Sequence, residues 1–254
     1  NEPSIEYIQP DYKLYKSSIQ DPDFIKQWGL INSGEDINGI SGLSGFDINV
    51  ASLWDTFGIN SNILVGVLDT GIDINHEDLK DSIYKNTLEL SNTYDDDKNG
   101  YIDDYCGWDF INSDNSVYDG AEDSHGTHIA GIIAAGANSI GIRGVASGVK
   151  IVPLKFMNDM AGYTSDLIEA IEYAKKLGIK IINCSFSDTH YNYALEQAMK
   201  NSDILFVCSA GNEKSNMPSY PSSYRLPNMI SVGAVDNQGN MAPFSNYGQL
   251  VDVA

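Results

Sequence analysis

The sequence predicts an α/β fold of three layers, in which helices cover both faces of a doubly wound, mostly parallel sheet. Short apolar runs recur along the chain and are consistent with strands buried on both faces. Helical patterns with one apolar face lie between these runs. Strands that alternate with helices are typical of a parallel sheet. The apolar runs are residues 62–68, 150–154, 179–184, 204–208 and 230–235.

The N-terminal part of the chain precedes this pattern. Residues 1–20 are expected to form an extended arm, because Pro3 and Pro10 interrupt them. Residues 31–50 are rich in Gly, Ser and Asn, which is typical of a surface loop. The 254 residues are 42% apolar, which is enough for one large core, and we expect residues 21–254 to form a single domain.

Three segments predict helices. Thr164 is positioned to cap the start of the clearest one, and Gly178 to end it. Residues 127–135 and 193–201 predict two more. The helix expected between Thr164 and Gly178 has a single apolar stripe, formed by Leu167, Ile168, Ile171, Ala174 and Leu177.

Composition excludes some classes of protein. The net charge is −20, with 35 acidic and 15 basic residues, so nucleic-acid phosphates would be repelled. No stretch approaches the roughly 20 apolar residues of a membrane span. The three cysteines form no disulfide framework. Cys184 and Cys208 stand in apolar runs and are interpreted as small buried hydrophobic residues, with a bridge between them as the alternative.

Polar motifs stand where an α/β sheet holds its ligands, beyond the carboxyl ends of the strands. Asp69 follows the first apolar run, and Asn212 lies just beyond the fourth. His125 precedes a predicted helix. Each residue alone is more often a turn former or a satisfied polar group. Their combination on these elements indicates a catalytic site.

These motifs together resemble those of the subtilisin-like serine proteases, the subtilases. The resemblance covers essentially the whole chain from about residue 20 onward. It implies a subtilisin-like fold. Asp21-Pro22 and residues 27–30 are similar to a thermitase-like secreted branch. The matching segments are DTGID at 69–73, HEDL at 76–79, HGTHIAG at 125–131, GIRGVA at 141–146, SVGAV at 231–235 and FSNYG at 244–248.

The resemblance assigns the catalytic roles of a serine endopeptidase. His125 is the expected general base, and Asp69 orients its imidazole. Asn212 matches the asparagine that donates to the oxyanion. His128 matches a second, non-catalytic histidine. A metal-dependent hydrolase that uses His125 and His128 is disfavoured, because such ligand pairs need a spacing of four.

The family's nucleophile lies in a Gly-Thr-Ser-Met-Ala-like segment, which these 254 residues lack. We therefore expect residues 21–254 to be a subtilase catalytic domain without its C-terminal part, and the chain alone to be inactive. The alternative is a non-catalytic pseudoprotease that acts by binding or regulation.

The resemblance also implies a cleft for extended polypeptide substrates. Ser185, Phe186 and Ser187 match the strand that pairs with the substrate. Ser187 stands where the family usually has glycine, which leaves the primary pocket's preference open. Gly162 and Tyr163 are expected to form the facing rim.

An acidic segment between Asp69 and His125 predicts a structural calcium site. Hard oxygen ligands on alternate residues around a glycine turn are typical of the first half of an EF-hand loop. A bare acidic surface loop is the alternative. The expected ligands are Asp95, Asp97, Asn99, the carbonyl of Tyr101 and a closing carboxylate from Asp104 or Asp103.

The resemblance alone implies a second calcium site. Asp252 could contribute to a weaker one. The expected ligands of the second site are Asp78, the Asn138 side chain, the carbonyls of Gly136, Ile140 and Ile142, and Asp21.

The family resemblance finally suggests where the protein acts. Residues 7–10 are similar to a propeptide junction, so we expect a zymogen that is secreted to the extracellular space or the cell envelope. Its own propeptide or a C-terminal fragment are the candidate protein partners.

Overall fold

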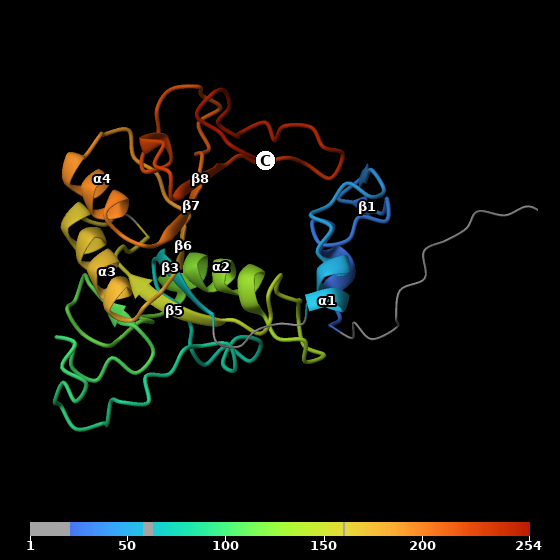
Figure 1. Cartoon of the computed structure of the whole chain (residues 1–254). Coiled ribbons are helices and arrows are strands. Elements are labelled where there is room, and N and C mark those ends of the chain that lie inside the picture. The colour runs from blue at the N-terminus through green and yellow to red at the C-terminus, as the bar shows by residue number, and fades with distance from the viewer. Residues whose placement is uncertain (1–20, 58–62, 160) are drawn as a thin grey trace, which may run out of the picture.

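The computed structural model describes residues 21–57, 63–159 and 161–254. The predicted arm, residues 1–20, lies outside this part of the chain, as does the proposed propeptide junction. A six-stranded sheet with parallel pairing between all neighbours forms the centre (Figure 1). In spatial order its strands are β4 (Trp108–Asp109), β5 (Lys150–Lys155), β3 (Leu64–Asp69), β6 (Ile181–Cys184), β7 (Leu205–Ser209) and β8 (Met229–Val232).

Helices lie on both sides of this sheet, which confirms the predicted three-layer α/β fold. In Figure 1, α3 and α4 lie on one side of the strands and α2 lies on the other. The helices are α1 (Ala51–Phe57), α2 (Ser124–Ala134), α3 (Thr164–Lys176) and α4 (Tyr193–Lys200). Short 3-10 helices span Phe24–Lys26, Ala121–Asp123 and Ser222–Tyr224.

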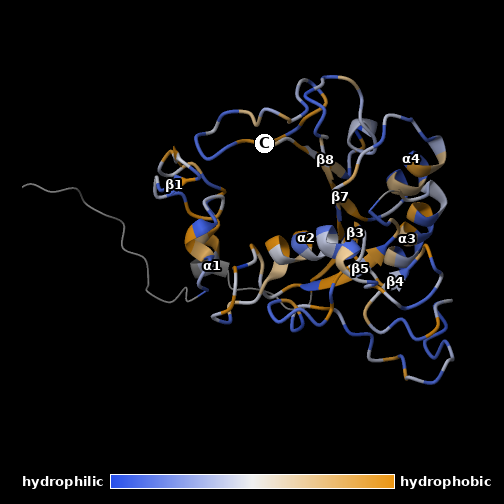
Figure 2. Cartoon of the chain, turned by 180° about the vertical axis from the view of Figure 1, so that it is seen from behind, coloured by the Kyte–Doolittle hydropathy of each residue, from blue (hydrophilic) through white to orange (hydrophobic). Residues whose placement is uncertain are grey.

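Alternate residues of β3 supply the two cores. Leu68 packs in the cluster that includes Ile171 of α3, whereas Val67 packs in the cluster that includes Ala130 of α2. A Cβ at Gly66 would lie 2.8 Å from a methyl group of Leu154, so the strand has no room for a side chain there. Figure 2 shows the hydrophobic colouring concentrated in the strands and much of the loop surface coloured as hydrophilic.

Two local expectations need correction. Thr164 does not cap α3: Tyr163 occupies the cap position without a side-chain hydrogen bond, and Thr164 is the first helical residue. Within the predicted loop 31–50, β1 (Asp36–Ile37) and β2 (Ile40–Ser41) form an antiparallel hairpin. Its turn, Asn38-Gly39, has positive φ at both residues, and this dipeptide favours such hairpin turns.

The cysteines are free, as the preferred interpretation predicted. Cys184 and Cys208 are both buried and lie opposite each other on β6 and β7. Burial, followed by the hydrogen bond with Cys208, raises the pKa of the Cys184 thiol. None of the helices in the described part of the chain is long and apolar enough to cross a membrane.

Candidate active site

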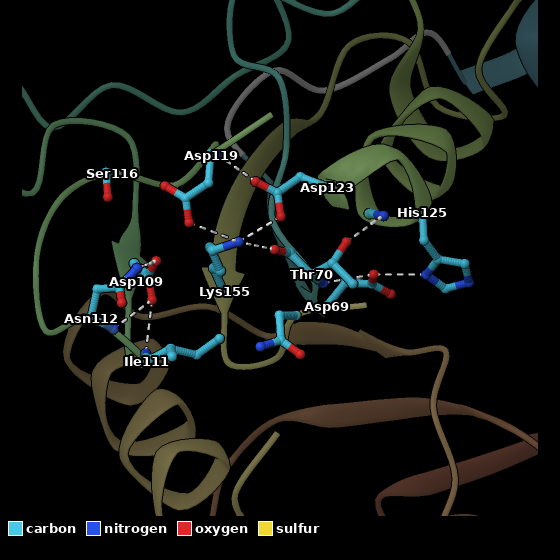
Figure 3. Close-up of polar contacts among 12 residues, drawn as sticks. Asp69, Thr70, Asp109, Ile111, Asn112, Ser116, Asp119, Asp123, His125 and Lys155 are labelled. Carbon is cyan, nitrogen blue, oxygen red and sulfur yellow. Dashed lines mark hydrogen bonds and ion pairs between the residues drawn. The ribbon is translucent and has the colours of Figure 1, made fainter. Parts of the chain in front are cut away.

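Asp69 and His125 meet at the carboxyl edge of the sheet. Asp69 is the last residue of β3, and its side chain is 1% exposed. His125 is the second residue of α2, and its side chain is 55% exposed. Nδ1 of His125 lies 2.7 Å from Oδ1 of Asp69 (Figure 3). The imidazole therefore has one nitrogen on a buried carboxylate while its ring remains accessible to a substrate.

Glycine at the start of α2 allows this approach. A Cβ at Gly126 would lie 2.2 Å from the carbonyl oxygen of Gly71, so no other residue fits between helix and strand. The amide of Gly126 donates to Oγ1 of Thr70, and the amide of Thr70 donates to Oδ1 of Asp69. The sequence motif thus encodes the close packing that brings the two side chains together.

The Asp69 carboxylate contacts His125 through only one of its two oxygens. Oδ2 is buried and accepts no hydrogen bond from the described residues. A carboxylate hydrogen-bonded to Nδ1 stabilises the imidazolium that forms when a catalytic histidine accepts a proton. The pair can therefore stabilise an imidazolium, which is what proton transfer through His125 would produce.

Asn212 lies at the same edge of the sheet. It follows β7, which is separated from β3 only by β6, and the carboxyl ends of the three strands align. The side chain of Asn212 is exposed. Its position next to Gly211, where φ is +106°, places it on a sharply turning loop.

Asn246 holds the loop of Asn212, a role that the sequence did not reveal. Its buried carboxamide donates to the carbonyl of Ala210 at 2.8 Å and to the Glu213 carboxylate at 2.8 Å. It also accepts the amides of Glu213 and Ser215, at 3.1 and 2.9 Å. The only signal in the sequence was its place in the segment 244–248.

Four of the five predicted substrate residues line one cavity of about 310 Å³. Gly162 and Tyr163 line it together with Phe186 and Ser187, and Leu195 adds apolar surface. The rings of Phe156 and Phe186 pack 4.7 Å apart beside it. Such a cavity suits an apolar side chain of an extended peptide.

Ser185 is not among the residues that line this cavity, and its hydroxyl accepts a hydrogen bond from Asn183. Asp188 and His190 line the cavity but were missed by sequence reasoning, which had no motif for them. Their side chains lie 2.9 Å apart, and the hydrogen bond from His190 lowers the pKa of the Asp188 carboxyl.

His125 and His128 have different surroundings. His128 lines a separate cavity of about 420 Å³ with His76 and Asp73, whereas His125 is not among its lining residues. His125 bonds to Asp69 instead. This separation argues against a metal centre held by the two histidines of α2.

The acidic segment brings together three carboxylates, one of them unforeseen. Ligand oxygens of Glu89, Asp95 and Asp97 lie within 4.8 Å of one another. Glu89 is buried and accepts the amides of Asp97 and Asp103. Three carboxylates this close repel one another unless a cation is present, and oxygen ligands suit calcium. Glu89 lies outside the EF-hand spacing, so the pattern gave no signal for it.

Asp104 and Asp103, the predicted closing ligands, bond to other groups of the protein. Asp104 is fully buried and accepts hydrogen bonds from Tyr173, Asn99 and Asn86. Burial raises the pKa of Asp104 despite these donors. The carboxylate of Asp103 accepts the amides of neighbouring residues 92 and 93. Among the described residues, Asp103 and Asp104 are not part of the group formed by Glu89, Asp95 and Asp97, and the closing carboxylate and the carbonyl of Tyr101 remain predictions.

Residues of the second expected calcium site are also adjacent. Asp21 and Asp78 are both buried, and each accepts hydrogen bonds from the loop around Asn138. The Asn138 side chain donates to Asp78 at 3.0 Å. The donor set of two carboxylates and one amide fits calcium. The carbonyls of Gly136, Ile140 and Ile142 remain predicted ligands.

Asp252, the expected ligand of a weaker calcium site, accepts a hydrogen bond from the amide of Ser231 at 2.8 Å. This bond ties the C-terminal segment to β8. Among the described residues, Asp252 is not part of a group of three or more side chains that could hold a metal ion.

Comparisons with known proteins identify relatives of this chain. A family model described as "Subtilase family" matches residues 60–254. A thermophilic serine proteinase of Bacillus sp. (strain AK1) is 31% identical over 100% of this chain and 55% of its own length. Thermitase of Thermoactinomyces vulgaris is 32% identical over 82% of this chain and 67% of its own length. A cell wall-associated protease of Bacillus subtilis (strain 168) is 32% identical, with 99% of this chain and 26% of that protein covered.

Solved structures agree with these relatives. The psychrophilic subtilisin-like protease Apa1 from Pseudoalteromonas sp. AS-11 has a TM-score of 0.56 and 28% identity, covering 76% of this chain and 40% of that one. A cold-adapted subtilisin-like serine proteinase has a TM-score of 0.60 at 24% identity over 77% of this chain and 63% of that one, which shows the shared fold. The chain spans about half the length of the first curated relative.

Proposed function

This chain belongs to the subtilase family, and on that premise we propose that the full-length protein is a serine endopeptidase that cleaves peptide bonds through an acyl-enzyme. His125 is the general base and Asp69 orients it, while Asn212 donates to the oxyanion. Residues 21–254 form part of the catalytic domain. The proposal is carried by the 2.7 Å contact between the buried Asp69 carboxylate and the accessible His125 imidazole.

The proposal requires a serine nucleophile that none of the motifs identified in this sequence supplies. None of the serines in these 254 residues stands in a Gly-Thr-Ser-Met-Ala-like segment. Within the described residues, Nε2 of His125 has no hydrogen-bond partner, so that nitrogen is available to a serine hydroxyl. A full-length protein without such a serine would be a pseudoprotease that binds peptides.

The cleft supports extended polypeptides as the substrate class. Its mixture of aromatic walls and small residues at Gly162 and Ser187 suits an apolar side chain. The exposed Tyr163 can cover a bound peptide from the rim.

Calcium is proposed as a structural ion at both acidic sites. The convergence of Glu89 with Asp95 and Asp97 supports the first, and the burial of Asp21 and Asp78 supports the second. Relatives include a cell wall-associated protease and an extracellular basic protease of Dichelobacter nodosus, and we propose the extracellular space or the cell envelope as the place of action. A processed zymogen with its own propeptide as partner is part of the same proposal.

The test uses the full-length protein and a fluorophosphonate probe that labels activated serines. We expect labelling and cleavage of an unfolded protein, and His125→Ala abolishes both. His128→Ala, one turn along the same helix, is the control and keeps both. Peptide binding without labelling or cleavage would favour the pseudoprotease. The 254 residues expressed alone are expected to cleave nothing.

A further inference from the structure

A buried lysine lies beside the catalytic pair, and the proposed mechanism gives it no role. Lys155 ends β5 and is 1% exposed. Its ammonium lies 2.5 Å from the carbonyl oxygen of Thr70 and 2.5 Å from Oδ1 of Asp123. A third partner, the partly exposed Asp119, lies at 3.3 Å. A fully buried cation is rare in proteins unless it is paired, so this position calls for an explanation.

The partners of Lys155 belong to the two segments that carry the catalytic side chains. Thr70 directly follows Asp69, and Asp123 lies two residues before His125 (Figure 3). Asp123 is fully buried, and its backbone carbonyl accepts the hydroxyl of Thr127 in the first turn of α2. One ammonium therefore links the end of β3 to the start of α2.

The Lys155 ammonium is bonded to these neighbours and not to the pair itself. Lys155, Asp69 and His125 all lie in the described part of the chain, and no hydrogen bond or ion pair joins the lysine to the other two. Burial lowers the pKa of Lys155, but Asp123 and Asp119 outweigh this, so the pKa is raised and the side chain stays charged.

Close packing of the backbone does not by itself explain why a charged lysine lies between β3 and α2. Gly71 and Gly126 already allow the close approach of β3 and α2. Close approach does not define how far the helix can slide or rotate against the strand. Two charge-assisted contacts from one fixed ammonium do define it, because each is strong and directional. Displacements of about 1 Å cost up to about 10²-fold in rate at catalytic sites.

We propose that Lys155 is a positioning residue, which holds the Asp69 carboxylate and the His125 imidazole in register by anchoring Thr70 and Asp123 to one buried ammonium. The consequence for rate rests on the proposed serine endopeptidase function. The consequence for the geometry of the pair does not, because the contact between Asp69 and His125 exists in the folded chain whether or not it hydrolyses peptides.

The test compares Lys155→Met with Lys150→Met in the full-length protein. Lys150 begins the same strand and also donates to a backbone carbonyl, that of Asp81, so it is a matched control far from the pair. The first readout is the proton on Nδ1 of His125 in protein labelled with ¹⁵N-histidine, assigned by its absence in His125→Gln. The second readout is the separation of kcat from KM for a peptide substrate.

We expect Lys155→Met to lose or broaden the Nδ1 proton resonance. We also expect it to lower kcat about 10- to 100-fold, with KM within about twofold. Lys150→Met keeps both values. If the full-length protein hydrolyses nothing, the resonance alone decides the proposal. A Lys155→Met protein that keeps the resonance and kcat overturns the positioning role while the protease function stands.

Removing the lysine alone leaves the Asp123 carboxylate buried without its partner, and this can unfold the protein. The double variant Lys155→Met with Asp123→Asn removes both charges and keeps similar volumes, which is often neutral for stability. Circular dichroism confirms its folding. A folded double variant without the resonance supports the proposal, and one with the resonance and an unchanged kcat overturns it.

Discussion

Replacing Asn246 by alanine is expected to loosen the loop that carries Asn212. The Asn246 side chain is buried and makes hydrogen bonds to Ala210, Glu213 and Ser215. Alanine cannot replace any of them. The loop would then lose the contacts that define where the Asn212 amide points.

The magnitude follows from those contacts. Bonds to the Ala210 carbonyl and to the two amides of Glu213 and Ser215 contribute about 1 kcal/mol each. The bond to the Glu213 carboxylate is left out, because that side chain is exposed and water can replace Asn246 there. We therefore expect Asn246→Ala to lower the free energy of unfolding by about 3 kcal/mol.

The assays are urea denaturation and steady-state kinetics of the full-length protein. We expect kcat to fall about 10- to 100-fold with little change in KM, since a displaced oxyanion donor acts on the transition state. Asn240→Ala is the control. Asn240 is exposed, and among the described residues its carboxamide bonds only to Asp236 and Gln238, so its loss should cost under about 0.5 kcal/mol. Equal stability losses for the two variants would refute the reasoning.

Two further predictions concern Tyr173 and the proposed calcium sites. Burial and the neighbouring Asp104 raise the pKa of the Tyr173 hydroxyl above its usual value of 10.0. Above about pH 10, the folded protein therefore keeps the Tyr173 proton that the unfolded chain releases. The free energy of unfolding should therefore fall as pH rises above about 10, and urea denaturation of Tyr173→Phe should show a shallower fall; an identical fall contradicts this. Calcium at a hundredfold excess over its dissociation constant should stabilise the protein by about 2.7 kcal/mol at each site relative to chelator. Glu89→Gln should lose much of this gain in thermal denaturation while the exposed Glu35→Gln keeps it, and equal gains would exclude Glu89 as a ligand.

Much of the fold could be predicted because its signals are local. An apolar run such as residues 179–184 and a stripe such as that of α3 each report burial within a few residues of sequence. The two-residue strand β4 gave no such signal, since nothing in Trp108-Asp109 alone distinguishes a strand from a loop. The predicted cap of α3 was wrong by one residue. Tyr163 has an extended backbone and Thr164 is already helical, a difference that the hydrophobic pattern of the sequence does not show.

The sequence alone determined the order of the motifs, the α/β class, and the identity of the strand-end aspartate and helix-start histidine. Each of these depends on residues that are close together in the chain. Only the tertiary structure decided which distant groups meet. The convergence of Glu89 on Asp95, and of Lys155 on Thr70 and Asp123, depends on how strands and loops far apart in sequence are aligned in space. Hydrophobic periodicity shows which face of a segment is buried, but it carries no information about which polar side chain of another segment lies against it.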